Sequence, residues 1–406
     1  MAVKSRTVFY ISGFDPNGAR WYHKLYREEA AKQAAVSSLR LDVGRWQEDG
    51  DHSISWDIEA DDNGHSVRTR YRFLCWDDII RNHWPTAGGA TYALAFSNPW
   101  NFLRRGVLTN VYRTAWPTFL CGMLPTIFFS SAALAVLAGC VVLAMIGASL
   151  TDISIWLALM ALLLPGGYLL FKFMASLDQK LRLHWLSRVY AFNLVQAERT
   201  AEGLAERTRH FARLIVDEVN RGETDEVLIV AHSTGCQLTV SVMAEALQDL
   251  PAGRMPTLMT IGGSIPMLAW DEEADWFRQD LRTVAECAHL PWLDFSAAQD
   301  GACFALRNPA ALVLPDHPET ERPKVLSIKL ADRLPKERIR EIYWDKFAIH
   351  FQYLMASEQP AEYDYFAITA GAMTLQERFS QRPTTVGFTR LESKMWPRRR
   401  PSGGKC

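Results

Sequence analysis

The hydrophobic pattern changes its period once within the segment 226–247. Residues 227–230 are four consecutive apolar residues, mostly β-branched, which is typical of a buried parallel strand. Apolar residues then recur at helical spacing, at Leu238, Val240, Val242, Met243, Ala246 and Leu247. The linking sequence is Ala231-His232-Ser233-Thr234-Gly235. We therefore expect Ser233 on a sharp strand-to-helix turn, with the N-terminus of the following helix pointing at its hydroxyl.

Two long segments, 119–150 and 153–171, contain no charged residue. Each is long enough to cross a bilayer, for which about 20 apolar residues suffice. Only Thr151-Asp152 separates them, so the pattern predicts a membrane hairpin with Asp152 at its turn. The alternative is a pair of buried core helices, although a soluble domain rarely buries two such runs side by side.

Lysine and arginine flank this hairpin and are missing from its turn. They lie at Arg104, Arg105, Arg113, Lys172, Lys180, Arg182 and Arg188. The positive-inside rule then predicts that both ends of the hairpin are cytoplasmic, with the rest of the chain on that side of an inner or plasma membrane. Trp116, Trp156 and Trp185 are expected near the membrane interfaces, where indole rings are favoured.

Short strand patterns alternate with helical patterns through the rest of the chain. Strands are expected at 8–11, 39–43, 67–73, 71–76, 257–261, 292–295 and 325–330. Helices are expected at 20–37, 175–221, 273–287 and 336–342, and a polar loop or hairpin at 48–64. This alternation predicts an α/β fold with a mostly parallel sheet and helices on both faces.

The pattern divides the chain into four parts. Residues 1–100 form the first part of the α/β domain, and 101–189 form the hairpin insertion with spans at about 117–148 and 153–174. Residues 190–390 complete the α/β domain, and 391–406 form a basic disordered tail. Ligands in such sheets bind at the carboxyl ends of the strands, so we expect Gly13, Asp77, Ser233, Gly262 and Asp300 at one edge.

Composition narrows the possible partners. The formal net charge is −1 over 406 residues, which does not favour nucleic acid as a partner. Seven cysteines are scattered without a CxxC pair, so neither a disulfide framework nor a zinc site is indicated, and a reducing compartment fits best. Residues 1–6 lead directly into a strand, and we expect no signal peptide there. No cofactor or metal is expected, and a homo-oligomer is compatible with the sequence.

The turn around Ser233 resembles the nucleophile elbow of the α/β-hydrolase superfamily, as found in lipases and esterases. Ala231 replaces the usual first glycine, a departure that some lipase branches share. The resemblance covers roughly 7–81 and 190–356 and implies a serine nucleophile activated by a histidine and an acid that follow it in the chain. The simpler interpretation is a serine that only caps the helix.

His350 is the candidate base because it follows the last expected strand, where this superfamily carries its histidine. His232 adjoins the serine and is expected to point away, His289 precedes a strand, and His317 lies in a proline-rich loop. Alternatively, His350 packs on a helix face against the core.

Asp300 is the candidate acid, because it follows the strand 292–295 by a short loop, as the acid does in the superfamily. Asp294 is the competing acid, although it lies inside that strand, and Asp300-Gly301 could be only a turn.

Two backbone N–H groups must stabilise the oxyanion of a tetrahedral intermediate. The resemblance assigns them to Thr234 and Phe14, with Gly13 beside Phe14 in the substrate site. Asp15 is a candidate orienting group there, and Asp77 is a candidate for the pocket wall, with a helix cap as the alternative.

Three functions remain open from the sequence. The first is a membrane-anchored serine esterase or lipase acting on lipid or acyl-ester substrates through an acyl-enzyme. The second is a non-catalytic membrane scaffold or partner-binding protein that retains the hydrolase fold, since a fold does not imply a function. The third is a thioesterase acting on a soluble acyl substrate.

Overall fold

The structure is a computed structural model that describes residues 2–84, 88–151, 153–251, 253–314 and 322–385. Asp152, His317 and the tail expected at 391–406 lie outside the described residues.

A nine-stranded mixed sheet with helices on both faces forms the body of the molecule. Its strands are β1 (Ser5–Ile11), β2 (Arg40–Val43), β3 (Gln47–Glu48), β4 (Ser53–Asp62), β5 (His65–Leu74), β6 (Glu226–His232), β7 (Thr257–Ile261), β8 (Trp292–Ser296) and β9 (Lys324–Ser327). The strand order is β2-β4-β5-β1-β6-β7-β8-β9, with β3 paired to β4.

The helices fall into three groups along the chain. Before the hairpin lie α1 (Ala19–Gln33), α2 (Asp77–Asn82), α3 (Gly88–Arg104) and α4 (Val107–Thr114). The hairpin and its return comprise α5 (Trp116–Leu150), α6 (Ile155–Leu181), α7 (Leu183–Ala197) and α8 (Leu204–Arg221). The remainder are α9 (Gly235–Ala246), α10 (Ile265–Ala269), α11 (Asp275–Glu286), α12 (Leu330–Arg333), α13 (Lys336–Ile342), α14 (Lys346–Phe351), α15 (Tyr365–Ala370) and α16 (Leu375–Arg378), with 3-10 turns at Pro309–Leu312 and Gln352–Leu354.

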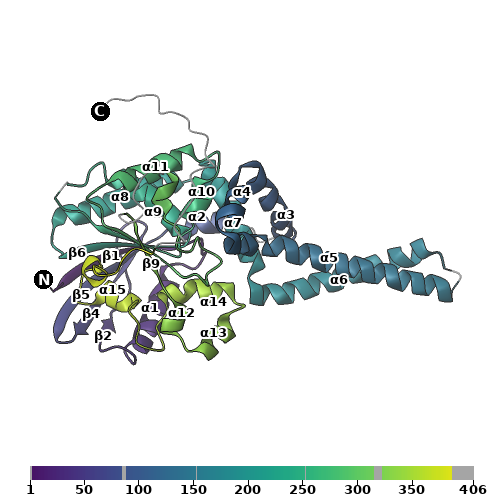
Figure 1. The fold of residues 1–406 in the computed structure, drawn as a ribbon, viewed down its shortest axis with the longest axis horizontal. Coiled ribbons are helices and arrows are strands. Elements are labelled where there is room, and N and C mark those ends of the chain that lie inside the picture. The colour runs from purple at the N-terminus through teal and green to yellow at the C-terminus, as the bar shows by residue number, and fades with distance from the viewer. Residues whose placement is uncertain (1, 85–87, 152, 252, 315–321, 386–406) are drawn as a thin grey trace.

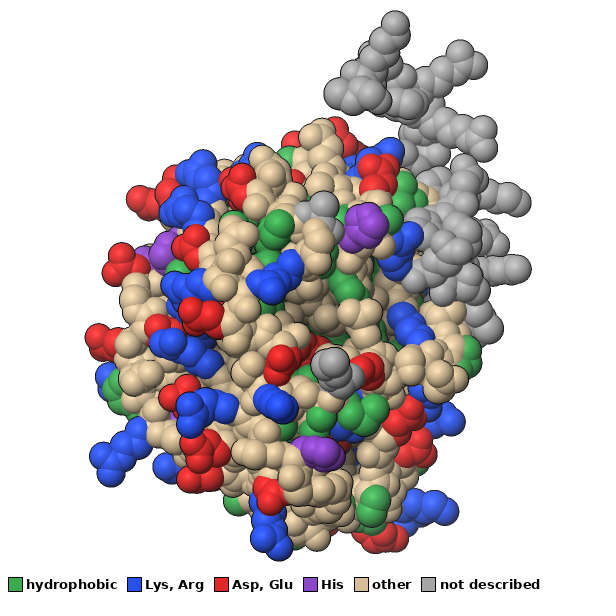
Figure 2. All heavy atoms as spheres, turned by 90° about the vertical axis from the view of Figure 1, so that its left-hand side faces the viewer, with side chains coloured by type: hydrophobic (Ala, Val, Ile, Leu, Met, Phe, Trp, Pro, Cys, Tyr) green, Lys and Arg blue, Asp and Glu red, His purple; other side chains and the backbone are tan. Residues whose placement is uncertain are grey.

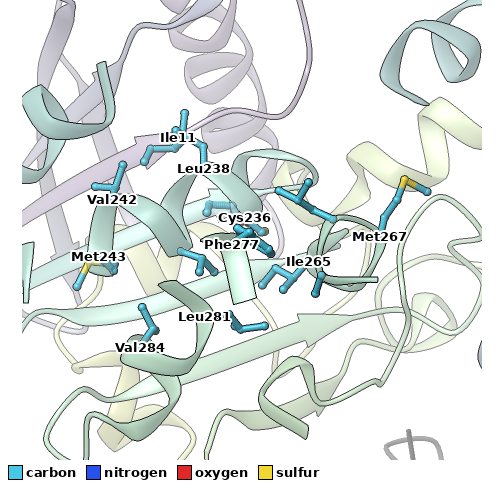
Figure 3. Close-up of a cluster of buried hydrophobic side chains, with 14 of the residues drawn as sticks. Ile11, Cys236, Leu238, Val242, Met243, Ile265, Met267, Phe277, Leu281 and Val284 are labelled. Atoms are coloured by element: carbon cyan, nitrogen blue, oxygen red, sulfur yellow. Dashed lines mark hydrogen bonds between the residues drawn. The ribbon is translucent and has the colours of Figure 1, made fainter. Parts of the chain in front are cut away.

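Side chains along β1 point alternately to the two faces of the sheet, and each face is covered by its own helices. Phe9 and Ile11 enter the core beneath α8, α9 and α11, whereas Val8 and Tyr10 enter the core on the side of α1 and α15 (Figure 1). Figure 3 shows the first core, in which α9 is held between Ile11 and the side chains of α11. The α/β class expected from the sequence is therefore confirmed.

The expectation of a mostly parallel sheet is wrong for the sheet as a whole. The strands β5, β1, β6, β7, β8 and β9 run parallel, but β2, β3 and β4 join them by antiparallel pairing. The cause is the turn at Asn63-Gly64, where both residues have positive φ (54° and 87°). A two-residue turn of this kind returns the chain directly and forces the antiparallel hairpin β4-β5.

The helices α5 and α6 project together from the body (Figure 1). In their most apolar stretches the mean hydropathy is 2.5 and 1.8, and only 11% and 6% of the residues are buried. This exposure excludes the alternative of two buried core helices. By length and composition, both helices are suited to cross a membrane.

The hairpin is joined to the body by a small base of helices. Ala95 of α3, Phe129 of α5, Met174 of α6 and Leu183 of α7 form a separate apolar cluster there. Beyond Phe129, roughly 20 residues of α5 remain, which span about 30 Å at the rise of an α-helix. At the end of the molecule away from the hairpin, the surface instead carries scattered charges of both signs (Figure 2).

Candidate functional site

Ser233 lies on the turn between β6 and α9, as the hydrophobic pattern predicts. Its φ is +59°, a left-handed conformation that is uncommon outside glycine and stores backbone strain. The Ser233 N–H donates to Ile261 O at 3.0 Å, and Ser233 O accepts from Cys236 N at 3.1 Å, so the turn is fixed on both sides.

Two glycines make this turn possible through close approach. A Cβ at Gly235 would lie 2.6 Å from Ile11 O and closer still to Ser12 O. A Cβ at Gly13 would lie 2.8 Å from Ser233 Cβ and 3.2 Å from Ser233 Oγ. Gly13 therefore packs directly against the serine side chain, next to the reacting position expected from the sequence.

His350 and Asp300 form a buried pair. Nδ1 of His350 lies 2.8 Å from Oδ2 of Asp300, and both side chains are about 1% exposed. Burial by itself would raise the pKa of Asp300, but His350, the Tyr353 hydroxyl and the Ala302 N–H together hold that pKa below its ordinary value. Asp300 is thus a carboxylate, and Nδ1 of His350 is the donor in this bond.

The other nitrogen of His350 is available for proton transfer. His350 Nε2 is buried and has no hydrogen-bond partner. Ser233 is 7% exposed, and its hydroxyl makes no hydrogen bond to His350 in this structure. His232, which precedes Ser233 in the chain, has its ring centroid 4.7 Å from that of His350.

His232 and Tyr353 support His350, and sequence reasoning missed both roles. Nε2 of His232 donates to the backbone oxygen of His350 at 3.0 Å. Burial, followed by the neighbouring His350, lowers the pKa of His232 to about 3, so it stays neutral. The Tyr353 hydroxyl donates to Asp300 Oδ2 at 2.8 Å and accepts from Ala297 N at 3.1 Å. The sequence interval Asp300–Tyr353 carries no periodic signal that could have revealed this bond.

The competing acid, Asp294, does not reach His350. Its carboxyl accepts a hydrogen bond from the Thr260 hydroxyl at 2.5 Å, within the sheet. Burial raises the pKa of Asp294 to about 7, opposite in direction to the shift at Asp300. Of the two candidate acids, the structure brings Asp300 to the histidine.

The two expected oxyanion donors are the N–H groups of Phe14 and Thr234, and the Phe14 N–H already has an acceptor. The Phe14 N–H donates to the Thr234 hydroxyl at 2.6 Å. The N–H of Phe14 would have to exchange this hydroxyl for a substrate oxygen before it could serve as an oxyanion donor. The Thr234 side chain is therefore a further group that sequence reasoning did not include.

Asp15 and Asp77 have structural partners. Asp15 accepts from the Asn17 N–H at 3.0 Å and from the Tyr22 hydroxyl at 2.9 Å, and burial raises its pKa. Asp77 is paired with Arg81 one turn along α2. Both carboxylates thus hold the first loop and α2 in place, and their expected contact with substrate stays a prediction.

Helix α7, which follows the hairpin, covers this site. Its Phe192 stacks on Phe14 at 4.5 Å between ring centroids, and its Trp185 lies 5.9 Å from the His350 ring. The site is consequently closed to solvent by a helix of the inserted segment.

Within the described ranges, no group of three or more His, Cys, Asp or Glu side chains is arranged to hold a metal ion. No family model matches the chain, and comparison with curated proteins and with solved structures also gives no match.

Proposed function

We propose that the chain is a membrane-anchored serine hydrolase that cleaves carboxylic esters, with Ser233 as nucleophile, His350 as base and Asp300 as the orienting acid. The observation that carries this proposal is the His350 ring. Asp300 bonds its Nδ1, its Nε2 is unpaired, and the ring lies 4.7 Å from that of His232, which precedes the strained turn at Ser233. The resemblance of that turn to the elbow of α/β-hydrolases supports the same assignment.

The proposed reaction proceeds through an acyl-enzyme. Ser233 Oγ attacks the ester carbonyl carbon while its proton passes to His350 Nε2, and the imidazolium then gives that proton to the departing alcohol oxygen. Water attacks the acyl-enzyme, again losing a proton to His350, and the acid product leaves as Ser233 regains its hydrogen. The Thr234 and Phe14 N–H groups donate to the oxyanion in both steps.

This cycle needs two changes from the resting geometry. The serine hydroxyl must turn to His350 Nε2, and Phe14 N–H must release the Thr234 hydroxyl. Catalytic hydrogen bonds are often long or misaligned without substrate, so the missing bond between Ser233 and His350 is compatible with the assignment.

The anchor is proposed to be the hairpin of α5 and α6. The hydrocarbon core of a bilayer is about 30 Å thick, close to the length of the part of α5 beyond Phe129. The cations that flank the hairpin favour cytoplasmic placement of both ends and of the catalytic domain. The substrate would then be a lipid or acyl ester at that membrane, with no role for nucleic acid.

A fluorophosphonate probe tests the proposal, because it labels only an activated serine. Purified full-length protein should be labelled, Ser233→Ala should not, and Ser241→Ala on the same helix should be labelled like wild type. A folded wild type that resists the probe would favour the non-catalytic scaffold, and labelling of Ser233→Ala would place the nucleophile elsewhere. Hydrolysis of matched esters and thioesters by the active protein separates the esterase from the thioesterase.

A further inference from the structure

An apolar cavity lies inside the base of the hairpin, on the inserted segment. It is enclosed by α3, α4, α5 and α7 and by Met267 of α10, and its volume is about 30 Å³. Most of its lining is carbon, with Phe102, Val107 and Tyr190 among the buried wall residues. At this volume the closed cavity has room for only a few atoms, so an apolar ligand can enter only when its walls move apart.

The polar groups in the cavity wall are largely satisfied within the protein. Asn98 Nδ2 donates to Ser187 O at 2.7 Å, the Ser187 hydroxyl donates to Leu183 O at 3.1 Å, and the Thr118 hydroxyl donates to Cys303 O at 2.7 Å. Asn98 Oδ1 is buried without a partner, and it is the one such side-chain atom found in the described wall. The wall thus disfavours a charged ligand and suits a hydrocarbon chain.

The rim of the cavity lies where the hairpin leaves the body. Leu94, Pro99, Phe119 and Met123 line it and are partly exposed. The same helices carry strongly exposed aromatic side chains, at Phe96 (49%), Trp100 (61%), Tyr112 (61%) and Trp116 (64%). Aromatic side chains with a polar tip favour the membrane–water interface, so this rim lies at the level where a bilayer anchored by α5 and α6 would begin.

The inner end of the cavity adjoins the catalytic groups. Thr118, which lines it, bonds the backbone of Cys303, and Cys303 Sγ in turn contacts Asp300 O at 3.4 Å. Tyr190, on the opposite wall, lies on α7, the helix that carries Trp185 against His350 and Phe192 against Phe14. Helices α5 and α7, which line the cavity, thus also contact the residues around the proposed catalytic groups.

We propose that this cavity binds the acyl chain of a bilayer lipid, which enters at the aromatic rim and places its ester beside Ser233 when α5 and α7 separate. This inference rests on the proposed hydrolase function and adds its substrate class, a long-chain ester taken directly from the membrane. A long chain buries more apolar surface between the separated helices than a short one does, so the site should select long-chain esters.

The variant Gly122→Leu tests the cavity, with Gly139→Leu on the same helix as its control. Gly122 lines the cavity, and a Cβ there would lie 3.5 Å from Tyr190 Oη, a contact without a clash. A Cβ at Gly139 would meet no atom within 4 Å. The readout is the ratio of 4-methylumbelliferyl oleate to 4-methylumbelliferyl acetate hydrolysis by full-length protein in phosphatidylcholine vesicles.

We expect this ratio to fall about tenfold or more in Gly122→Leu and to stay at the wild-type value in Gly139→Leu. An unchanged ratio in a Gly122→Leu protein that hydrolyses acetate would overturn the cavity as the acyl site. If wild type hydrolyses neither ester, the proposed hydrolase function is contradicted instead. The crosslinking measurement then decides whether the cavity binds an acyl chain.

Binding is measured with vesicles that contain a phosphatidylcholine carrying a diazirine in its acyl chain. Crosslinks from wild type should map to cavity residues within 94–123 and 187–190 and should be lost in Gly122→Leu. Crosslinks confined to the exposed faces of 130–173 in both proteins would overturn the proposal. Preferential hydrolysis of oleoyl-coenzyme A without cavity crosslinks from vesicles would overturn the bilayer as the source.

Discussion

The hydroxyl of Tyr353 donates to Asp300 Oδ2 at 2.8 Å, the same oxygen that accepts the Nδ1–H of His350. Burial, followed by the charge of Asp300, raises the pKa of Tyr353 well above its ordinary value, so this hydroxyl remains a donor. Tyr353 thereby fixes the position of the carboxylate that orients the proposed base, although it does not touch the reacting atoms.

Tyr353→Phe should move the acidic limb of the kcat/KM profile to higher pH. The Tyr353 hydroxyl helps to hold the pKa of Asp300 below its ordinary value, so without this bond Asp300 takes up a proton at a higher pH and no longer orients His350. We expect kcat/KM at pH 7 to fall roughly threefold to tenfold. A hydrogen bond to a charged group is worth about 1.5–3 kcal/mol, and only part of that free energy affects the orientation of His350. Tyr363→Phe is the control, since its hydroxyl bonds Tyr353 O and not the acid. Equal loss at all pH values in Tyr353→Phe would mean a purely structural role.

Ser233, His350 and Asp300 should act as one unit. Ser233→Ala and His350→Ala should each abolish most ester hydrolysis while membrane association persists, and the double variant should lose little more. Rates measured with a p-nitrophenyl ester check this. Near wild-type turnover by Ser233→Ala, or additive losses in the double variant, would contradict the assignment.

Asp294→Asn should retain hydrolysis and alter the pH dependence of stability, whereas Asp300→Asn should lose hydrolysis. The folded state holds the proton of Asp294 up to a pKa of about 7, while an unfolded aspartate ionises near pH 4. Between these two pKa values a rise in pH favours unfolding, so the free energy of unfolding of wild type falls across that range. Above pH 7, Asp294 causes no further change in it.

Asparagine cannot ionise, so Asp294→Asn should gain stability relative to wild type between pH 4 and 7, on the order of 4 kcal/mol at most. Thermal unfolding in detergent at pH 4.5 and 7.5 measures the difference. A difference that is the same at both pH values would show that Asp294 does not titrate with folding.

Gly235→Ala should destabilise the protein by about 1–3 kcal/mol, the usual cost of overpacking a well-packed site. The added methyl group meets the backbone carbonyls of Ile11 and Ser12, which cannot move without breaking the sheet. Gly253→Ala is the matched control, because a Cβ there meets no atom within 4 Å. Chemical denaturation of the two variants side by side checks the prediction, and equal midpoints would contradict it.

The hairpin should resist carbonate extraction, and its turn should face away from the cytoplasm. A cysteine at Thr151 should be labelled from the non-cytoplasmic side and one at Ser5 should not, with wild type as the background for native cysteines. Two crossings return the chain to the side it left, which β1 and β6 require in order to pair. Labelling of both positions from one side would place the hairpin in the interface.

Local features were readable from the sequence. The strand, turn and helix around Ser233 follow from a change of hydrophobic period, and α5 and α6 follow from the length of their uncharged runs. The sequence left a loop and a hairpin open at 48–64. It did not establish β4 or its antiparallel pairing with β5, because the polar residues of that segment obscure the alternation in β4.

The chain by itself determined the α/β class, the exposed apolar helix pair and the turn at Ser233, since each depends on residues close in sequence. Only the tertiary structure decided that Asp300, not Asp294, meets His350, and that α7 closes the site. The bond between Tyr353 and Asp300 joins residues 53 positions apart, and that between His232 and His350 joins residues 118 apart. Such contacts depend on how the sheet and the inserted segment pack together, and hydrophobic periodicity does not encode that packing.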